Sequence, residues 1–145
     1  MKLSSRTRYG MRAILELALE YGKAPLQIKV IAEREDISNK YLEQLIAMLK
    51  ASGLVRSIRG PRGGYLLAKP PEEILLKEIF LTLEGPMVPA ECLQHPEYCV
   101  RCSDCATRQI WQELQDAIFG VLESVTLADL VDRSLSAKKT TNYHI

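Results

Sequence analysis

Four cysteines stand close together in this chain, which has only four: Cys92, Cys99, Cys102 and Cys105 fall within 14 residues. A small secreted protein stabilised by disulfides would have its cysteines distributed along the chain. The clustering seen here therefore favours metal ligation. The spacing Cys99-x2-Cys102-x2-Cys105 suits thiolates that converge on an iron–sulfur cluster, and Cys92 completes a set of four ligands.

The spacing alone leaves the metal open. Four thiolates also suit tetrahedral zinc. Arg101 and Arg108 could instead activate a neighbouring thiol for redox chemistry. His95 lies in the same loop and could replace one cysteine as a ligand, although an exposed loop histidine is its simpler interpretation.

The charge of the chain is divided unevenly, although the net charge is only +1. Residues 1–69 hold 13 Lys/Arg against 6 Asp/Glu, a net charge of +7, and residues 70–145 hold 6 against 12, a net charge of −6. The basic part is therefore the part expected to contact phosphates.

The basic part has the pattern of a helix-turn-helix. Apolar residues at helical spacing predict a helix over residues 7–21, ended by Gly22, and a short helix from residue 28 to about Asp36. Ser38 stands as the N-cap of a third helix that Gly53 ends. Two short helices joined by a tight turn predict DNA binding, with base-reading candidates in the first turns of the second: Ser38, Asn39, Lys40, Glu43 and Gln44.

A β-hairpin follows the helix-turn-helix. Residues 54–59 and 65–68 read as strands, and the turn Gly60-Pro61-Arg62-Gly63-Gly64 between them can supply positive φ angles. Its basic tip, with Arg59 and Arg62, predicts a wing that enters a narrow minor groove. The basic side chains expected to contact phosphates without reading sequence include Arg8, Lys29 and Arg56.

The acidic part continues with a helix expected over residues 72–84 and the cysteine loop. Apolar residues at 3-4 spacing then predict a long amphipathic helix over 106–124, most simply buried against its copy in a dimer. Thr126 with Asp129 resembles a capping box for a short last helix. The expected organisation is a winged helix-turn-helix domain (1–84), a cluster-binding loop (85–105), a dimerisation helix with a short last helix (106–136) and a loose tail (137–145).

These features exclude several function classes. No apolar run approaches the ~20 residues of a membrane span, so we expect a cytoplasmic protein. The sequence also lacks a nucleophile triad, a phosphate loop and paired carboxylates with a histidine base, so we expect neither an enzyme nor a small-molecule substrate.

The sequence resembles the Rrf-type family of winged-helix transcription regulators, whose members include IscR, NsrR and CymR. The similar runs cover nearly the whole chain: Met1-Lys2-Leu3-Ser4 with Arg8-Tyr9-Gly10, Ile37-Ser38 with Tyr41-Leu42-Glu43-Gln44-Leu45, Arg59-Gly60-Pro61 with Gly63-Gly64-Tyr65-Leu66-Leu67, and Cys105-Ala106-Thr107-Arg108 with Ile110-Trp111.

The resemblance implies a mainly α-helical homodimer that binds a partly palindromic double-stranded operator. It also implies an iron–sulfur cluster in each subunit, [2Fe–2S] or [4Fe–4S] with the former favoured, that controls repression of cluster-biogenesis genes. The resemblance further implies that Glu43 reads a base in the major groove and that Arg59 enters the minor groove. The alternatives are a zinc- or thiol-dependent regulator of the CymR type, acting in sulfur metabolism, and a constitutive DNA-binding module with a structural metal loop.

The resemblance also assigns Cys92, Cys99 and Cys105 as cluster ligands. Here the chain departs from the IscR-like pattern, because Arg108 stands where the fourth, histidine ligand is expected. The fourth ligand is therefore Cys102, His95 or a group from elsewhere in the dimer.

Overall fold

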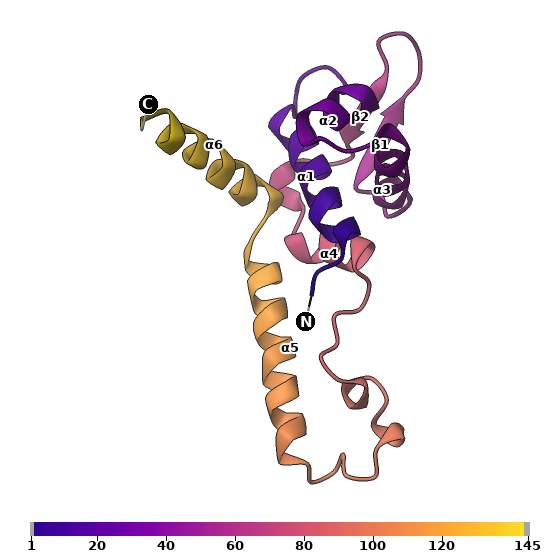
Figure 1. The fold of residues 1–145 in the computed structure, drawn as a ribbon, viewed down its shortest axis with the longest axis vertical. Coiled ribbons are helices and arrows are strands. Elements are labelled where there is room, and N and C mark those ends of the chain that lie inside the picture. The colour runs from indigo at the N-terminus through magenta and orange to yellow at the C-terminus, as the bar shows by residue number, and fades with distance from the viewer. Residues whose placement is uncertain (1, 144–145) are drawn as a thin grey trace.

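A computed structural model describes residues 2–143 of the chain. Its helical body is formed by α1 (Ser5–Leu19), α2 (Ile28–Glu35), α3 (Asn39–Ala51) and α4 (Leu76–Leu83), with a hairpin of β1 (Val55–Ile58) and β2 (Gly64–Leu67) beside α3 (Figure 1). Residues 85–105 lead away from this body, and α5 (Ala106–Ser124) returns to it before α6 (Leu127–Tyr143). The predicted class, a mainly α-helical winged helix-turn-helix with a long C-terminal helix, is confirmed.

The helix-turn-helix forms because apolar faces of α1, α2 and α3 share one core. Ile14, Ile31, Leu42 and Ile46 are essentially inaccessible to solvent in this core. Ser38 caps α3 as predicted, since its Oγ accepts a hydrogen bond from the N–H of Tyr41 at 3.2 Å.

The wing is a two-stranded antiparallel sheet in which Val55 pairs with Leu67 and Ile58 with Gly64. Gly60 takes a φ of 110°, which favours glycine, and its carbonyl accepts a hydrogen bond from the N–H of Gly63 at 2.9 Å. Leu26 and Tyr65 exchange two backbone hydrogen bonds of 3.0 and 2.7 Å, which fasten the wing to the segment before α2.

The predicted helix over residues 72–84 is wrong in its first turn. Residues Pro71–Glu73 form a short 3-10 turn, and α4 begins only at Leu76. The chain is extended in between because the Ile74 carbonyl accepts from the N–H of Leu127 at 2.8 Å, and the N–H of Leu76 donates to Val125 at 3.0 Å. Glu78 then caps the delayed start, accepting the N–H of Leu75 at 2.9 Å.

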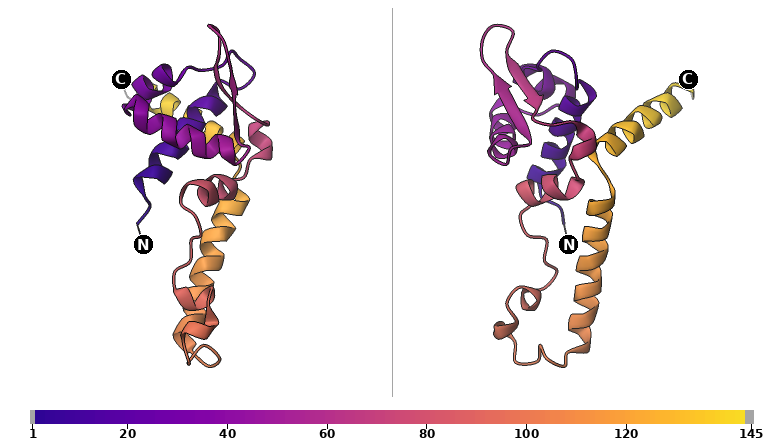
Figure 2. Two further views of the ribbon diagram at one scale, coloured as in Figure 1. Left: turned by 90° about the vertical axis from the view of Figure 1, so that its right-hand side faces the viewer. Right: turned by 180° about the vertical axis from the view of Figure 1, so that it is seen from behind.

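The long helix predicted over 106–124 is confirmed as α5, with the same bounds. It extends away from the body, and residues 85–105, with short 3-10 turns at Glu91–Leu93 and Pro96–Tyr98, connect its far end to α4 (Figure 2). The first of these turns contacts α5. The cysteine loop and α5 therefore form one arm.

The last helix is longer than expected. The predicted capping box is confirmed, since the N–H of Thr126 donates to Asp129 at 2.9 Å and the N–H of Asp129 to Thr126 Oγ1 at 3.1 Å. However, α6 continues to Tyr143, so residues 137–143 are helical and the expected end near 136 is wrong. Residues 144 and 145 of the expected tail lie outside the described part. No helix within residues 2–143 is long and apolar enough to cross a membrane.

Candidate DNA interface and cysteine loop

The polar residues at the start of α3 are presented to solvent together. Ser38, Asn39, Lys40, Glu43 and Gln44 are all exposed, while Leu42, Leu45 and Leu49 turn inward. Five exposed side chains with hydrogen-bonding capacity for base edges therefore occupy the first turns of the helix expected to enter the major groove.

The basic side chains of the wing separate into two groups. Arg59 and Arg62 are exposed at the tip, and Arg59 lines a hollow with Gln27 and Ile28 at the start of α2, one residue from Lys29. Arg56 instead lines a different hollow of about 320 Å³ between β2 and the end of α1, with Leu17 and Tyr21. Arg8 lies on the exposed face of α1.

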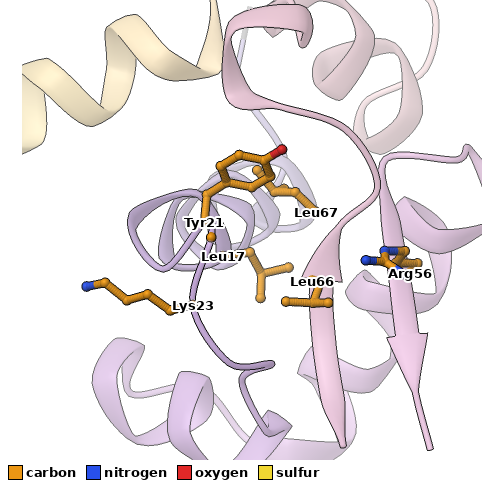
Figure 3. Close-up of a pocket in the computed structure, with 7 residues that line it drawn as sticks. Leu17, Tyr21, Lys23, Arg56, Leu66 and Leu67 are labelled. Atoms are coloured by element: carbon orange, nitrogen blue, oxygen red, sulfur yellow. The ribbon is translucent and has the colours of Figure 1, made fainter.

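The two basic side chains beside this hollow point in different directions. Figure 3 shows Lys23 pointing away from Leu66, and Arg56 on the neighbouring strand β1. The two cationic groups therefore do not converge on a common point.

The four cysteines are free thiols, and they divide into two environments. Partial burial raises the pKa of the Cys102 thiol, and the neighbouring thiols of Cys99 and Cys92 raise it further. Cys105 is the N-cap residue of α5, and a hydrogen bond to Thr107, at 3.2 Å, lowers its pKa, as does the backbone N–H of Arg108.

This donor set suits a thiolate-held group, but the loop is not a closed metal site. Within residues 2–143, no three Cys, His, Asp or Glu side chains gather tightly enough to hold a single metal ion. His95 is engaged elsewhere, with its ring stacked on Tyr98 at 4.7 Å and its Nδ1 3.2 Å from Glu97.

Arg108 connects the two ends of the cysteine loop. Its Nη2 donates to the carbonyl oxygen of Cys92 at 3.3 Å, and its buried Nε has no hydrogen-bond partner among the described residues. An arginine side chain offers N–H donors and no acceptor lone pair for a metal, so Arg108 holds the loop without ligating.

Sequence reasoning missed a polar cluster between the first helix and the cysteine loop. Oε2 of Glu84 accepts hydrogen bonds from Ser4 N at 3.2 Å, Ser4 Oγ at 2.7 Å and Thr7 Oγ1. Ser4 also caps α1, accepting the N–H of Thr7 at 3.2 Å, so the helix begins earlier than predicted. The pattern Ser-x-x-Thr before the first apolar face signals this cap.

Comparison with protein families decides the class of this molecule. Residues 3–133 match the model of the family described as "Rrf2: Iron-dependent Transcriptional regulator". The chain belongs to the Rrf2 family. It is therefore a DNA-binding transcriptional regulator and not an enzyme, as predicted.

The relatives of this chain include regulators named IscR and regulators named CymR. It is 42% identical to "Protein rrf2" of Nitratidesulfovibrio vulgaris over 98% of this chain and 95% of that one. It is 39% identical to the HTH-type transcriptional regulator CymR of Bacillus subtilis over the whole of both chains. The solved structure of T. potens IscR superposes with a TM-score of 0.78 at 37% identity, covering 94% of this chain and 90% of that one.

Proposed function

We propose that this Rrf2 regulator is a cytoplasmic repressor whose operator binding is controlled by an iron–sulfur cluster held in residues 92–105. The observation that carries the proposal is four free thiols within 14 residues, on an arm joined directly to a winged helix-turn-helix. We infer that its targets include genes of cluster biogenesis, because a protein that holds a cluster can report how much cluster the cell has assembled.

On the DNA side, the exposed start of α3 enters the major groove and the wing tip enters the minor groove. Glu43 reads a base by accepting a hydrogen bond from a cytosine amino group. Arg59 lies in a narrow minor groove, where the negative potential is strongest. Arg62 belongs to the same wing tip, while Arg8, Lys29 and Arg56 contact phosphates and position the protein without reading sequence.

The cluster ligands are Cys92, Cys99 and Cys105, with Cys102 as the fourth. Supporting this choice, Cys102 lies beside Cys99 and Cys92, whereas His95 contacts Tyr98 and Glu97 instead. When bound, a [2Fe–2S] or [4Fe–4S] group would supply a redox-active centre that is sensitive to cluster supply and oxygen. The chain's own contribution is to hold Cys105 at the start of α5 and Cys92 through Arg108.

The operator-binding form is a homodimer joined through α5. Supporting this, α5 leaves a continuous apolar stripe exposed: Ile110 and Leu114 are 49% and 47% exposed, and Val121 is 62% exposed. A stripe of this length on a single helix of a protein this small is buried in a second copy. Two copies of α3 then face a partly palindromic operator.

The alternative is a zinc- or thiol-dependent regulator of the CymR type, or a constitutive module. The similarity to CymR supports this alternative. Replacing all four cysteines by alanine separates a regulator controlled by its cysteines from the constitutive module. The proposal expects operator affinity to change by about 5- to 150-fold in that variant, the range of typical allosteric coupling. Unchanged affinity would favour the constitutive module.

A further inference from the structure

Glu84 lies at the junction between the DNA-binding body and the cysteine loop. It is the C-cap of α4, and Gly85, with a φ of 85°, and Pro86 follow it as the first residues of the loop. Its Oε2 accepts three hydrogen bonds from the N-cap and first turn of α1, where Ser4 and Thr7 lie 80 and 77 residues away in sequence. One donor, Thr7, is only 1% exposed. The hydrogen bonds from Thr7 and then Ser4 lower the pKa of Glu84, so the carboxylate stays ionised.

The packing next to this carboxylate is tight. Gly10 lies on α1 one turn after Thr7, and a Cβ placed on it would come within 2.5 Å of Leu83 Cδ1. A larger residue at this position would require the buried Leu83 side chain to shift. Because this contact adjoins the hydrogen bonds of Glu84 to Ser4 and Thr7, we expect a displacement of the end of α4 to displace the start of α1.

The start of α1 in turn contacts the recognition helix. Ser5 Oγ lies 3.2 Å from the hydroxyl of Tyr41, and the ring of Tyr9 packs edge-on against Tyr41 at 6.1 Å. Tyr41 is in the first turn of α3, two residues before Glu43. A contiguous path of hydrogen bonds and packed rings therefore joins Glu84 to the residues expected to read DNA.

We propose that Glu84 is the positioning residue through which the state of the cysteine loop sets operator affinity. This inference rests on the proposed function of the cysteine loop. The contacts from Glu84 to Tyr41, however, are present in the folded chain whatever the loop binds. When the loop rearranges, the end of α4 moves and Glu84 carries the first turn of α1 with it. Ser5, Tyr9 and Tyr41 then move the first turn of α3 relative to the groove. Contacts along a path do not by themselves establish coupling, so the test measures coupling directly.

The decisive quantity is the ratio of operator Kd values between cluster-loaded and chelator-stripped protein. It is measured by fluorescence anisotropy under anaerobic conditions, with a duplex selected from a random pool by the wild-type protein. We expect Glu84→Gln to bring this ratio close to one at unchanged iron content. The matched control Glu72→Gln, an exposed carboxylate in the 3-10 turn before α4, keeps the wild-type ratio. If Glu84→Gln keeps the wild-type ratio, the proposal is overturned. This includes the case in which the substitution weakens operator binding of the loaded and the stripped protein equally.

A second measurement needs no cluster and separates this inference from the proposed function. In stripped protein, we expect Glu84→Gln to speed amide hydrogen exchange over residues 4–10 and also over 38–44, whereas Glu72→Gln changes neither. Acceleration confined to 4–10 would overturn the path to α3 whatever the loop binds. If the wild-type protein takes up no cluster but both segments respond, the proposed function fails and the path stands. Thr7→Val removes one hydrogen-bond donor to Glu84, and we expect it to speed exchange over the same two segments. It replaces Glu84→Gln in this test if that variant does not fold.

Discussion

Glu84 carries a pH-dependent part of the stability. Its pKa is lowered from the ordinary value of 4.5 by the hydrogen bonds of Thr7 and Ser4, so its contribution is complete above about pH 4.5 and is lost as pH falls through the lowered value. We expect Glu84→Gln to lower the free energy of unfolding by about 1–3 kcal/mol at pH 7. Urea unfolding at pH 7 and at pH 3 measures this difference, which shrinks at the acid end. A constant difference across that range would contradict the role of the ionised carboxylate.

Arg59 is expected to contribute to sequence preference and not only to affinity. Because a narrow minor groove over A·T-rich DNA concentrates negative potential, Arg59→Ala should cost about 1–3 kcal/mol of operator binding and reduce the preference for A·T-rich flanks. Lys50→Ala, a matched loss of charge in the last turn of α3, should change little. Anisotropy titrations on duplexes with A·T-rich and G·C-rich flanks compare the two variants. Equal losses in both would contradict the wing assignment.

At the scale of elements, the close approach of α1 and α4 depends on Gly10. Gly10→Ala forces its Cβ against Leu83, and we expect a loss of about 1–3 kcal/mol in thermal or urea unfolding. Gly120→Ala is the matched control, since a Cβ there meets nothing within 4 Å, and alanine in an open helical site stabilises by about 0.5–1 kcal/mol. If both substitutions stabilise the protein, the tight α1–α4 contact is wrong.

Local sequence signals predicted the elements that are governed by local chemistry. Ser38 capping α3, the Thr126–Asp129 capping box and the bounds of α5 follow from nearby residues, and each is confirmed. The delayed start of α4 could not be predicted in this way, because residues 74–76 are held extended by hydrogen bonds to 125–127, far away in sequence. The cluster around Glu84 was missed for the same reason, since its partners lie 77 and 80 residues away.

The DNA-binding residues could be proposed from sequence because a recognition helix and a wing tip have recognisable local patterns. The cysteine loop shows the limit of spacing arguments. The neighbouring thiols of Cys99 and Cys92 raise the pKa of Cys102, whereas a hydrogen bond to Thr107 lowers the pKa of Cys105 at the start of α5, and the ligand set itself stays a prediction. Arg108 occupies the position of the expected histidine and uses its guanidinium to hold Cys92 instead.

At the scale of the whole molecule, we expect the exposed apolar stripe on α5 to be buried against a second copy of the chain. Introducing a charge at its centre, as in Leu114→Asp, should prevent the second copy from packing there and halve the mass measured by light scattering. Gln109→Asp, an exposed position on the same helix, should leave the mass unchanged. A Leu114→Asp protein that keeps the wild-type mass would place the interface elsewhere.

The central claim is that the arm formed by the cysteine loop and α5 carries an iron–sulfur cluster. Anaerobic purification followed by iron and acid-labile sulfide analysis, with the visible absorption spectrum, tests it directly. We predict a coloured protein with equal amounts of iron and sulfide, and loss of both when Cys92, Cys99 and Cys105 are replaced by alanine. A colourless protein with stoichiometric zinc would contradict the claim.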